Sequence, residues 1–235
     1  MKFSIITLFP EVFEPILNSS ILKRAQKKGL VEFELTNLRN FGEGKHQIVD
    51  DKPYGGGAGM VLRVDILAKA LKSIVSKLPT INYKLQTVLT SASGHPYKQK
   101  KATEFSQLDH LIIICGHYEG VDQRFIDKYT DEEISIGDYV LTGGEIPAMI
   151  IVDSITRLLP GVLEKPEATI NESFSTNYEL RTTNLLEHPQ YTRPEEFEEK
   201  KVPEVLLSGN HAEVDKWRAQ KSLEKTKKVR PDLLK

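Results

Sequence analysis

Residues 111–120 read LIIICGHYEG and carry the clearest structural signal in the chain. The first five are apolar and mostly β-branched, which favours a strand that is buried on both faces. Gly116 ends this run, and a second glycine follows at position 120. In parallel sheets, ligands bind in loops at the carboxyl ends of the strands. The stretch therefore predicts a central strand that leads directly into a ligand-binding loop.

On either side of this stretch, short apolar runs alternate with helical patterns. In residues 64–78 the apolar side chains recur three and four positions apart, as on one face of a helix. Residues 146–159 are apolar almost all round, which indicates a helix buried on more than one side. This alternation predicts an α/β fold with a mostly parallel sheet. Further strands are expected at residues 3–9, 31–38, 85–90 and 133–136.

The pattern changes after Pro160. Gly, Pro, Asn and Ser follow with little apolar periodicity, which is typical of a linker or a long functional loop. Strand signals are absent beyond it, so a small all-helical C-terminal domain is expected. Residues 216–235 hold eight Lys or Arg against two acids, as in a solvated helix face or a nucleic-acid contact. The expected parts are residues 1–160, 161–176 and 177–235, with helices at 177–187, 194–200 and 212–228.

The composition limits the class of protein. With 39% hydrophobic residues over 235 positions, the chain can bury a sizeable core and is not disordered as a whole. A net charge of -1 gives no overall positive field, so any attraction to RNA has to be local. The one cysteine, Cys115, excludes an intramolecular disulfide and fits a buried strand position better than a catalytic thiol. We expect a cytoplasmic protein with no membrane and no DNA partner.

Three glycine-bearing loops are candidates for binding a flat ligand: residues 90–94, 116–120 and 136–145. Glycines let backbone groups approach a ligand without an intervening Cβ. For any one loop alone, ordinary turn chemistry is the better explanation of the glycines. A fourth segment, residues 50–60, has four glycines in five positions but lacks the Lys-Ser/Thr pair of a phosphate-binding loop. A flexible substrate-binding loop is the better interpretation there.

Seven segments together resemble the TrmD family of bacterial tRNA (guanine-N1)-methyltransferases, of the SPOUT class. The resemblance spans nearly the whole chain, and the segments follow in the same order. They are LFPE at residues 8–11, VDDKPYGGG at 49–57, CGHYEGVD at 115–122, the loop at 135–145, PGVL at 160–163, YTRP at 191–194 and LLSGNHAE at 206–213.

The resemblance implies a fold, a reaction and partners. The expected fold is a SPOUT-type mostly parallel sheet with a deep trefoil knot. The expected reaction transfers a methyl group from S-adenosyl-L-methionine to N1 of guanosine at tRNA position 37, just 3′ of the anticodon. The family is a homodimer whose sites use both subunits, its C-terminal domain helps to grip the tRNA, and it is reported to depend on Mg²⁺. Residues 1–160 would then bind the methyl donor and residues 177–235 the tRNA.

The residues that match the family's motifs are the candidate site. Lys45 and His46 could also reach phosphate or base, and Asp50 with Asp51 could bind Mg²⁺, although no metal ligand is assigned. The cofactor-binding candidates are Leu89, Thr90, Ser91, Gly94, Gly116, Tyr118, Glu119, Ile136, Gly137, Asp138, Tyr139, Val140, Leu141, Gly143 and Gly144. The RNA-binding candidates are Lys45, His46, Tyr54, Gly55, Gly59, Tyr191, Arg193, Ser208, Asn210 and His211.

The resemblance assigns the catalytic roles to Glu172 and Arg157. Guanine N1 carries a proton at neutral pH, so a carboxylate is needed to accept it and a cation to stabilise the charge that develops. The family usually has Asp-Ser-Phe where this chain has Glu172-Ser173-Phe174, so the candidate base is one methylene longer. Glu164 and Glu167 are the alternatives.

Three other functions remain open. A related SPOUT methyltransferase could act on another base or on ribose. A non-catalytic RNA-binding protein could retain the fold. A nucleotide hydrolase could use the glycine-rich segment, although the missing Lys-Ser/Thr pair argues against it.

Overall fold

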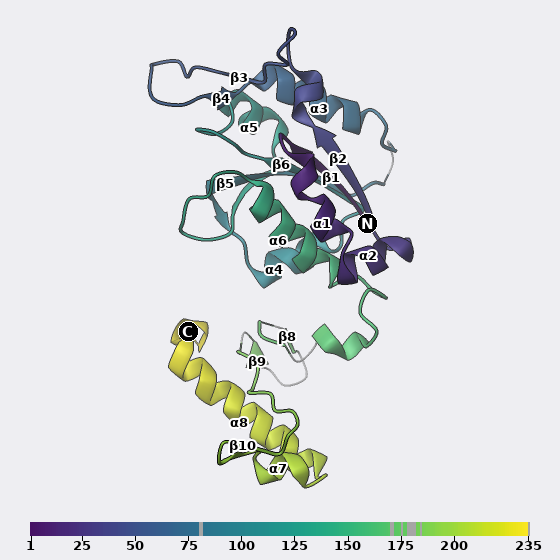
Figure 1. Ribbon diagram of the computed structural model, residues 1–235, viewed down its shortest axis with the longest axis vertical. Helices are drawn as coiled ribbons and strands as arrows, with labels where there is room; N and C mark the ends of the chain where they lie inside the picture. Colours follow the sequence, from purple (N-terminus) through teal and green to yellow (C-terminus); the bar gives the residue numbers. More distant parts are fainter. Residues whose placement is uncertain (80–81, 170–171, 175, 178–181, 184, 235) are drawn as a thin grey trace. The chain divides into compact units, whose positions relative to one another are not determined.

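In the computed structural model (Figure 1), a five-stranded sheet runs through the first unit of the chain. The described residues are 1–79, 82–169, 172–174, 176–177, 182–183 and 185–234. They form two units, Met1–Glu164 and Lys165–Lys235. The sheet has the order β2-β1-β6-β5-β7, and all four neighbouring pairs are parallel. Its strands are β1 Lys2–Thr7, β2 Glu32–Asn37, β5 Leu85–Pro96, β6 His110–Cys115 and β7 Glu132–Ser135.

Strand β6 is the centre of this sheet. All six of its residues are buried, and it pairs with β1 on one side and β5 on the other. A strand enclosed on both faces and both edges needs apolar residues at every position, which the Ile-rich run supplies. The predictions of a buried strand at 111–115 and of a parallel α/β sheet are both confirmed.

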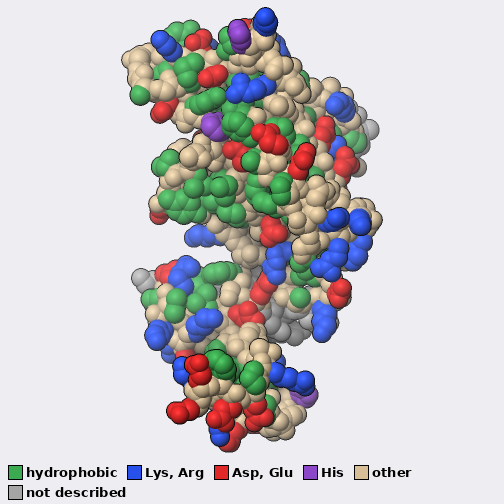
Figure 2. All heavy atoms as spheres, viewed as in Figure 1, with side chains coloured by type: hydrophobic (Ala, Val, Ile, Leu, Met, Phe, Trp, Pro, Cys, Tyr) green, Lys and Arg blue, Asp and Glu red, His purple; other side chains and the backbone are tan. Residues whose placement is uncertain are grey.

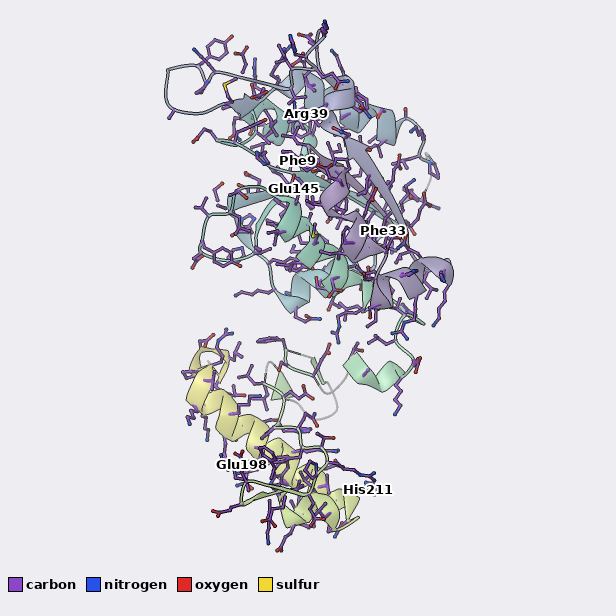
Figure 3. The ribbon with its side chains drawn as sticks, in the orientation of Figure 1. Phe9, Phe33, Arg39, Glu145, Glu198 and His211 are labelled. Atoms are coloured by element: carbon purple, nitrogen blue, oxygen red, sulfur yellow. The ribbon has the colours of Figure 1, made fainter. Side chains whose placement is uncertain are left out.

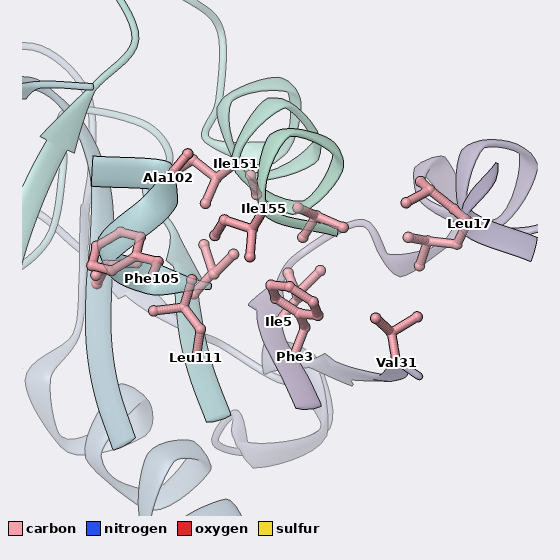
Figure 4. Close-up of a cluster of buried hydrophobic side chains, with 14 of the residues drawn as sticks. Phe3, Ile5, Leu17, Val31, Ala102, Phe105, Leu111, Ile151 and Ile155 are labelled. Carbon is pink, nitrogen blue, oxygen red and sulfur yellow. The ribbon is translucent and has the colours of Figure 1, made fainter. Parts of the chain in front are cut away.

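Helices cover both faces of the sheet. Leu111 and Ile113 of β6 face a core formed with α4 and α6, part of which Figure 4 shows. Ile112 and Ile114 face a second core formed with α3 and α5. The alternation follows from the two-residue repeat of a strand. The helices are α1 Glu14–Leu17, α2 Ser20–Lys27, α3 Val64–Val75, α4 Gln99–Phe105, α5 Gln123–Tyr129 and α6 Glu145–Thr156, with 3-10 helices η1 Pro10–Val12 and η2 Leu38–Phe41.

Strand β5 continues past the point where a loop was expected. Thr90 and His95 both pair with Ile134 of β7, so the residues between them are excluded from the ladder. Gly94 lies against the backbone of Glu133 and Ile134, where a side chain would overlap both. The expected loop at 90–94 is therefore a bulge within one long strand.

The glycine-rich segment connects two short strands, β3 Asp50–Asp51 and β4 Val61–Leu62, which pair antiparallel. It does not lead directly into α3, because β4 and Arg63 intervene. Gly55, Gly56 and Gly57 all have positive φ, a backbone conformation that side chains disfavour. Because no helix begins directly after the segment, it lacks the helix N-terminus that a phosphate-binding loop needs.

The second unit is not all-helical, so that prediction is wrong. Helix α8 His211–Val229 matches the expected helix at 212–228, and α7 Glu204–Leu207 precedes it. At 194–200, however, a hairpin forms whose turn residues Glu198 and Glu199 have positive φ. That geometry is a type I′ turn, and four glutamates in six residues also repel one another along a helix. The remaining elements are β8 Thr176–Asn177, β9 Thr182–Thr183, β10 Glu196–Phe197, β11 Lys200–Lys201, η3 Pro166–Thr169 and η4 Pro231–Leu234.

The expected helix at 177–187 is also contradicted where residues are described. Asn177 belongs to β8, and β8 pairs antiparallel with β9. Residues 178–181 and 184 lie outside the described residues. Across the described part of the chain, the helices are too short or too polar to cross a membrane.

Candidate active site

A pocket of about 490 Å³ opens at the carboxyl ends of the sheet strands in the first unit. It is lined by three loops: loop 1 (residues 89–93 of β5), loop 2 (residues 116–121, after β6) and loop 3 (residues 135–144, after β7). Parallel strands bring their carboxyl ends to one edge of a sheet, so loops that are distant in the sequence meet there. The size suits a nucleoside-sized ligand.

Backbone hydrogen bonds join the loops to one another. The Gly144 N–H donates to the Gly116 carbonyl oxygen at 2.8 Å, and His117 and Gly143 form an antiparallel bridge. The Thr90 hydroxyl lies 3.3 Å from the Gly144 oxygen and accepts a hydrogen bond from the Gly116 N–H at 3.4 Å. A side chain on Gly144 would overlap both Thr90 and Gly116. These glycines therefore allow a close approach of three backbones.

The pocket lining is acidic. Among the described residues that line it, Glu119 and Glu133 carry negative charge, and none is a lysine or an arginine. Phosphate groups are bound in proteins by Arg, Lys and helix N-termini. The lining therefore disfavours a nucleoside triphosphate and suits a ligand that carries positive charge.

The glycine-rich segment borders this pocket at its base. The Glu119 N–H donates to the Met60 carbonyl oxygen at 3.0 Å, and a side chain on Gly59 would overlap the Glu119 side chain. At the other end of the segment, Tyr54 is 99% exposed. The segment thus extends from the pocket wall into solvent with an aromatic ring near its start.

Most of the predicted cofactor residues come together here. Gly94 and Asp138 do not: Gly94 lies in a smaller adjacent cavity, and Asp138 is exposed outside the pocket lining. The candidates that line the pocket are Leu89, Thr90, Ser91, Gly116, Tyr118, Glu119, Ile136, Gly137, Tyr139, Val140, Leu141, Gly143 and Gly144.

Several lining residues had no signal in the sequence. Gln123 and Ile126 come from α5, Glu133 from β7 and Pro147 from α6. Each lies outside a glycine loop and reaches the pocket only because its element packs beside one. His117 belongs to loop 2 and could have been selected with its neighbours; its ring packs 5.3 Å, centroid to centroid, from that of Phe9.

The two catalytic candidates lie outside this pocket. Arg157 caps the C-terminus of α6, whereas the pocket touches the N-terminal end of the same helix. At 1.5 Å per residue, the twelve residues of α6 place these ends about 18 Å apart. Glu172 belongs to the second unit, and the pocket belongs wholly to the first. Of the alternatives, Glu164 ion-pairs with Arg24, and the side chain of Glu167 lies outside the described residues.

The RNA candidates fall into two groups. In the first unit, Lys45 and His46 are exposed at the tip of a short hairpin closed by the Glu43–Ile48 bridge. In the second unit, the Tyr191 ring lies 6.1 Å from that of Trp217 on α8. Arg193, also in the second unit, is exposed.

The residues of the turn before α8 stabilise the start of that helix. The Ser208 hydroxyl accepts from the Asn210 N–H at 3.1 Å, and the Asn210 side chain caps α8 by accepting from Glu213 N–H at 3.4 Å. His211 is the first residue of the helix. The cap explains Ser208 and Asn210 without RNA, and their role in binding stays a prediction.

Cys115 is not a nucleophile in this arrangement. Burial raises the pKa of its thiol well above the usual value, and the nearby negative charge of Glu145 raises that pKa further. The thiol therefore stays protonated, as expected for a core residue. Among the described residues, no three His, Cys, Asp or Glu side chains are grouped so as to hold a metal ion.

A parallel α/β sheet with a glycine-lined, acidic pocket at the carboxyl ends of its strands defines a protein that binds a small cofactor or substrate there. Comparison with known proteins narrows this class. The model of the family described as tRNA (Guanine-1)-methyltransferase TrmD matches residues 1–235, and the chain belongs to this family.

Curated relatives agree with the family over the full length. The chain is 51% identical to the tRNA (guanine-N(1)-)-methyltransferase of Bacillus velezensis, over 100% of this chain and 93% of the relative. It is 50% identical to the protein of the same name from Bacillus subtilis, with the same coverage. It is 48% identical to that of Listeria innocua, over 100% of this chain and 92% of the relative.

Proposed function

We propose that the protein is a tRNA (guanine-N1)-methyltransferase that moves a methyl group from S-adenosylmethionine to N1 of the guanine at tRNA position 37. The observation that carries the proposal is the acidic pocket lined by loop 1 within β5, loop 2 after β6 and loop 3 after β7. Membership of the family supports the proposed reaction, and the pocket is the proposed binding site of the methyl donor.

The pocket suits this cofactor in shape and charge. S-adenosylmethionine carries a positively charged sulfonium, which an acidic lining attracts and which loses its charge when the methyl group leaves. Its adenine can lie between Leu89, Ile136 and Leu141, with its edges hydrogen-bonded by backbone groups of the glycine loops. The methyl donor is already reactive, so the protein's task is to position it and to activate guanine.

Activation of guanine requires a base and a cation. The N1 proton has to leave before N1 can attack, and the negative charge that develops spreads to O6. Glu172 is proposed to accept that proton, and Arg157 to stabilise the charge at O6.

A second copy of the chain completes the proposed site. Arg157 cannot reach the pocket of its own chain, because α6 separates the two by about 18 Å. Helix α6 also exposes Ile146 and Ile150, and Figure 2 shows hydrophobic side chains gathered over it. Exposed apolar surface of this kind marks association sites. We therefore propose a homodimer in which α6 lies at the interface and each site uses residues of both copies.

tRNA contacts are proposed on both units. Tyr54, Lys45 and His46 would reach the anticodon loop from beside the pocket. In the second unit, Tyr191 with Trp217 offers aromatic rings for an unstacked base, and the basic residues of α8 would hold phosphates. The second unit would therefore grip the tRNA while the first unit holds the methyl donor.

Three finer features belong to the same proposal. The SPOUT class and its trefoil knot are consistent with loops 2 and 3, which are joined by the His117–Gly143 bridge. A Mg²⁺ ion, with Asp50 and Asp51 as candidate ligands, would assist the reaction as in the family. The reaction would take place in the cytoplasm, where tRNA is modified.

The proposal is tested by incubating the protein with Mg²⁺, labelled S-adenosylmethionine and either tRNA with guanine at position 37 or the same tRNA with adenine there. We expect label only in the first tRNA, recovered as 1-methylguanine on nucleoside analysis. Label in 2′-O-methylribose or at another ring position would contradict the assignment. If the protein bound tRNA but transferred no methyl group, it would be a non-catalytic RNA-binding protein.

A further inference from the structure

A buried carboxylate lies directly behind the pocket wall. Glu145, the first residue of α6, is only 8% exposed. The Thr7 hydroxyl, at the end of β1, donates to Glu145 Oε1 at 2.8 Å and in turn accepts from the Phe9 N–H at 3.0 Å. Figure 3 shows Phe9 and Glu145 next to each other, although they come from opposite ends of the first unit's sequence. The two hydrogen-bonded residues are called the Thr7–Glu145 pair below.

The carboxylate touches the pocket through Gly143. A side chain on Gly143 would overlap both the second Glu145 oxygen and the His117 ring. Gly143 and His117 line the pocket from loops 3 and 2, and they form the bridge that joins these loops. Glu145 thus lies against the junction of the two loops without lining the pocket itself.

Because the Glu145 carboxylate is buried, the hydrogen bond from Thr7 contributes to keeping it in place. A carboxylate taken out of water is costly unless hydrogen bonds replace its hydration. The N-terminus of α6 favours negative charge at this position, and Thr7 supplies the side-chain donor. Without that donor, the carboxylate would have to move toward solvent, and the loop junction in contact with it would move too.

We propose that Glu145, held by Thr7, is a positioning residue that fixes loops 2 and 3 in the shape that binds the methyl donor. The inference rests on the proposed function, since it takes S-adenosylmethionine as the ligand of the pocket. Neither Thr7 nor Glu145 lines the pocket, so the pair acts through Gly143 and His117.

The test compares Thr7→Val, which keeps the shape but removes the donor, with Thr7→Ser, which keeps the donor. The matched control is Thr156→Val on α6, the helix that begins with Glu145: Thr156 is also buried, and its hydroxyl lacks a hydrogen-bond partner among the described residues. S-adenosylmethionine affinity is measured by calorimetry, KM and kcat by methyl transfer, and folding by thermal melting.

We expect Thr7→Val to raise the Kd and the KM for S-adenosylmethionine about tenfold, the scale of a lost hydrogen bond to a charged group. The KM for tRNA and kcat should stay within about twofold of the wild type, and Thr7→Ser and Thr156→Val should bind the cofactor like the wild type. Should Thr7→Val fail to fold, Glu145→Gln replaces it, with about a threefold loss expected because the hydrogen bond becomes neutral.

Unchanged affinity in a folded Thr7→Val, or in a folded Glu145→Gln that replaces it, would overturn the inference. Equal weakening in Thr7→Ser and Thr7→Val would also overturn it, because the hydroxyl would then not be the cause. Absence of cofactor binding by the wild type would instead overturn the proposed function, and this inference would fall with it.

Discussion

In the proposed mechanism, Glu172 accepts the guanine N1 proton, so the proposal depends most on this side chain. We predict that Glu172→Gln slows methyl transfer about 100-fold, the usual effect of losing a general base, because an amide cannot accept the proton. The affinity for S-adenosylmethionine should be unchanged, since the pocket lies wholly in the first unit. Single-turnover rates and calorimetry measure the two quantities.

The control for this prediction is Glu164→Gln, which changes a carboxylate that is already ion-paired with Arg24. It should leave the rate near that of the wild type. If Glu164→Gln slowed transfer and Glu172→Gln did not, the base would have to be reassigned within the linker.

His110 gives the first unit a pH-dependent stability. Burial lowers the pKa of its imidazole to about 4, whereas the unfolded chain protonates near 6.5. Below pH 6.5 the unfolded state therefore holds more protons, and stability falls as the pH drops from 6.5 toward 4. The loss should reach about 3 kcal/mol at pH 4. Urea unfolding across this range measures it.

His110→Gln should flatten this pH dependence, because glutamine does not titrate. His95→Gln is the comparison variant, at a histidine whose side chain is largely exposed. Parallel slopes for the wild type and His110→Gln would contradict a buried neutral imidazole at this position.

Among the elements, α8 depends on its cap. Asn210 accepts from the Glu213 N–H and satisfies one of the free donors at the start of the helix. Asn210→Ala should destabilise the second unit by about 1 kcal/mol. Trp217 lies on α8 and is the one tryptophan of the chain, so its fluorescence reports the unfolding of this unit.

Asn210→Ser keeps a capping oxygen and should restore most of the lost stability. Comparing tRNA affinity in the two variants separates capping from RNA contact. If both variants bind tRNA equally poorly while only Asn210→Ala is unstable, Asn210 touches the RNA directly.

At the level of the full chain, we expect the first unit to bind the methyl donor and the second unit to be needed for methylation of tRNA. A chain ending at Glu164 keeps the sheet, both cores and the complete pocket lining. We expect it to bind S-adenosylmethionine like the full chain but to methylate no tRNA, because Glu172 and the proposed RNA contacts are lost. A fully active truncated chain would remove the second unit from the mechanism.

The proposed dimer makes a separate prediction. Gly144→Ala should close the pocket, since the added carbon would overlap Thr90 and Gly116, and Arg157→Gln removes the cation that the proposed dimer takes from the other copy. Co-expression of the two inactive chains should recover about a quarter of the wild-type activity, because half of the dimers contain one intact site of two. Recovery would not occur if each site were built from a single chain.

Local patterns were sufficient to predict the strands of the sheet and two of the three loops that line the pocket; the third expected loop is a bulge within β5. The apolar run at 111–115 predicted a buried strand because strands enclosed in parallel sheets need apolar residues at every position. The same reasoning placed Gly116 and Gly143 in loops at one edge of the sheet. The hairpin at 196–201 was missed because its acidic run shows neither helical nor strand periodicity, and its turn depends on positive φ at Glu198 and Glu199.

Only the tertiary structure shows which segments far apart in the chain contact each other. Gln123 and Pro147 line the pocket, and Thr7 reaches Glu145 across 138 positions, because helices and strands pack side by side. The type of a residue and of its neighbours in the sequence determines its preferred conformation and burial. The sequence therefore predicts the strands, the loops and the positions of their glycines. It does not record which distant residue will lie against it, since that depends on how the layers pack around one sheet.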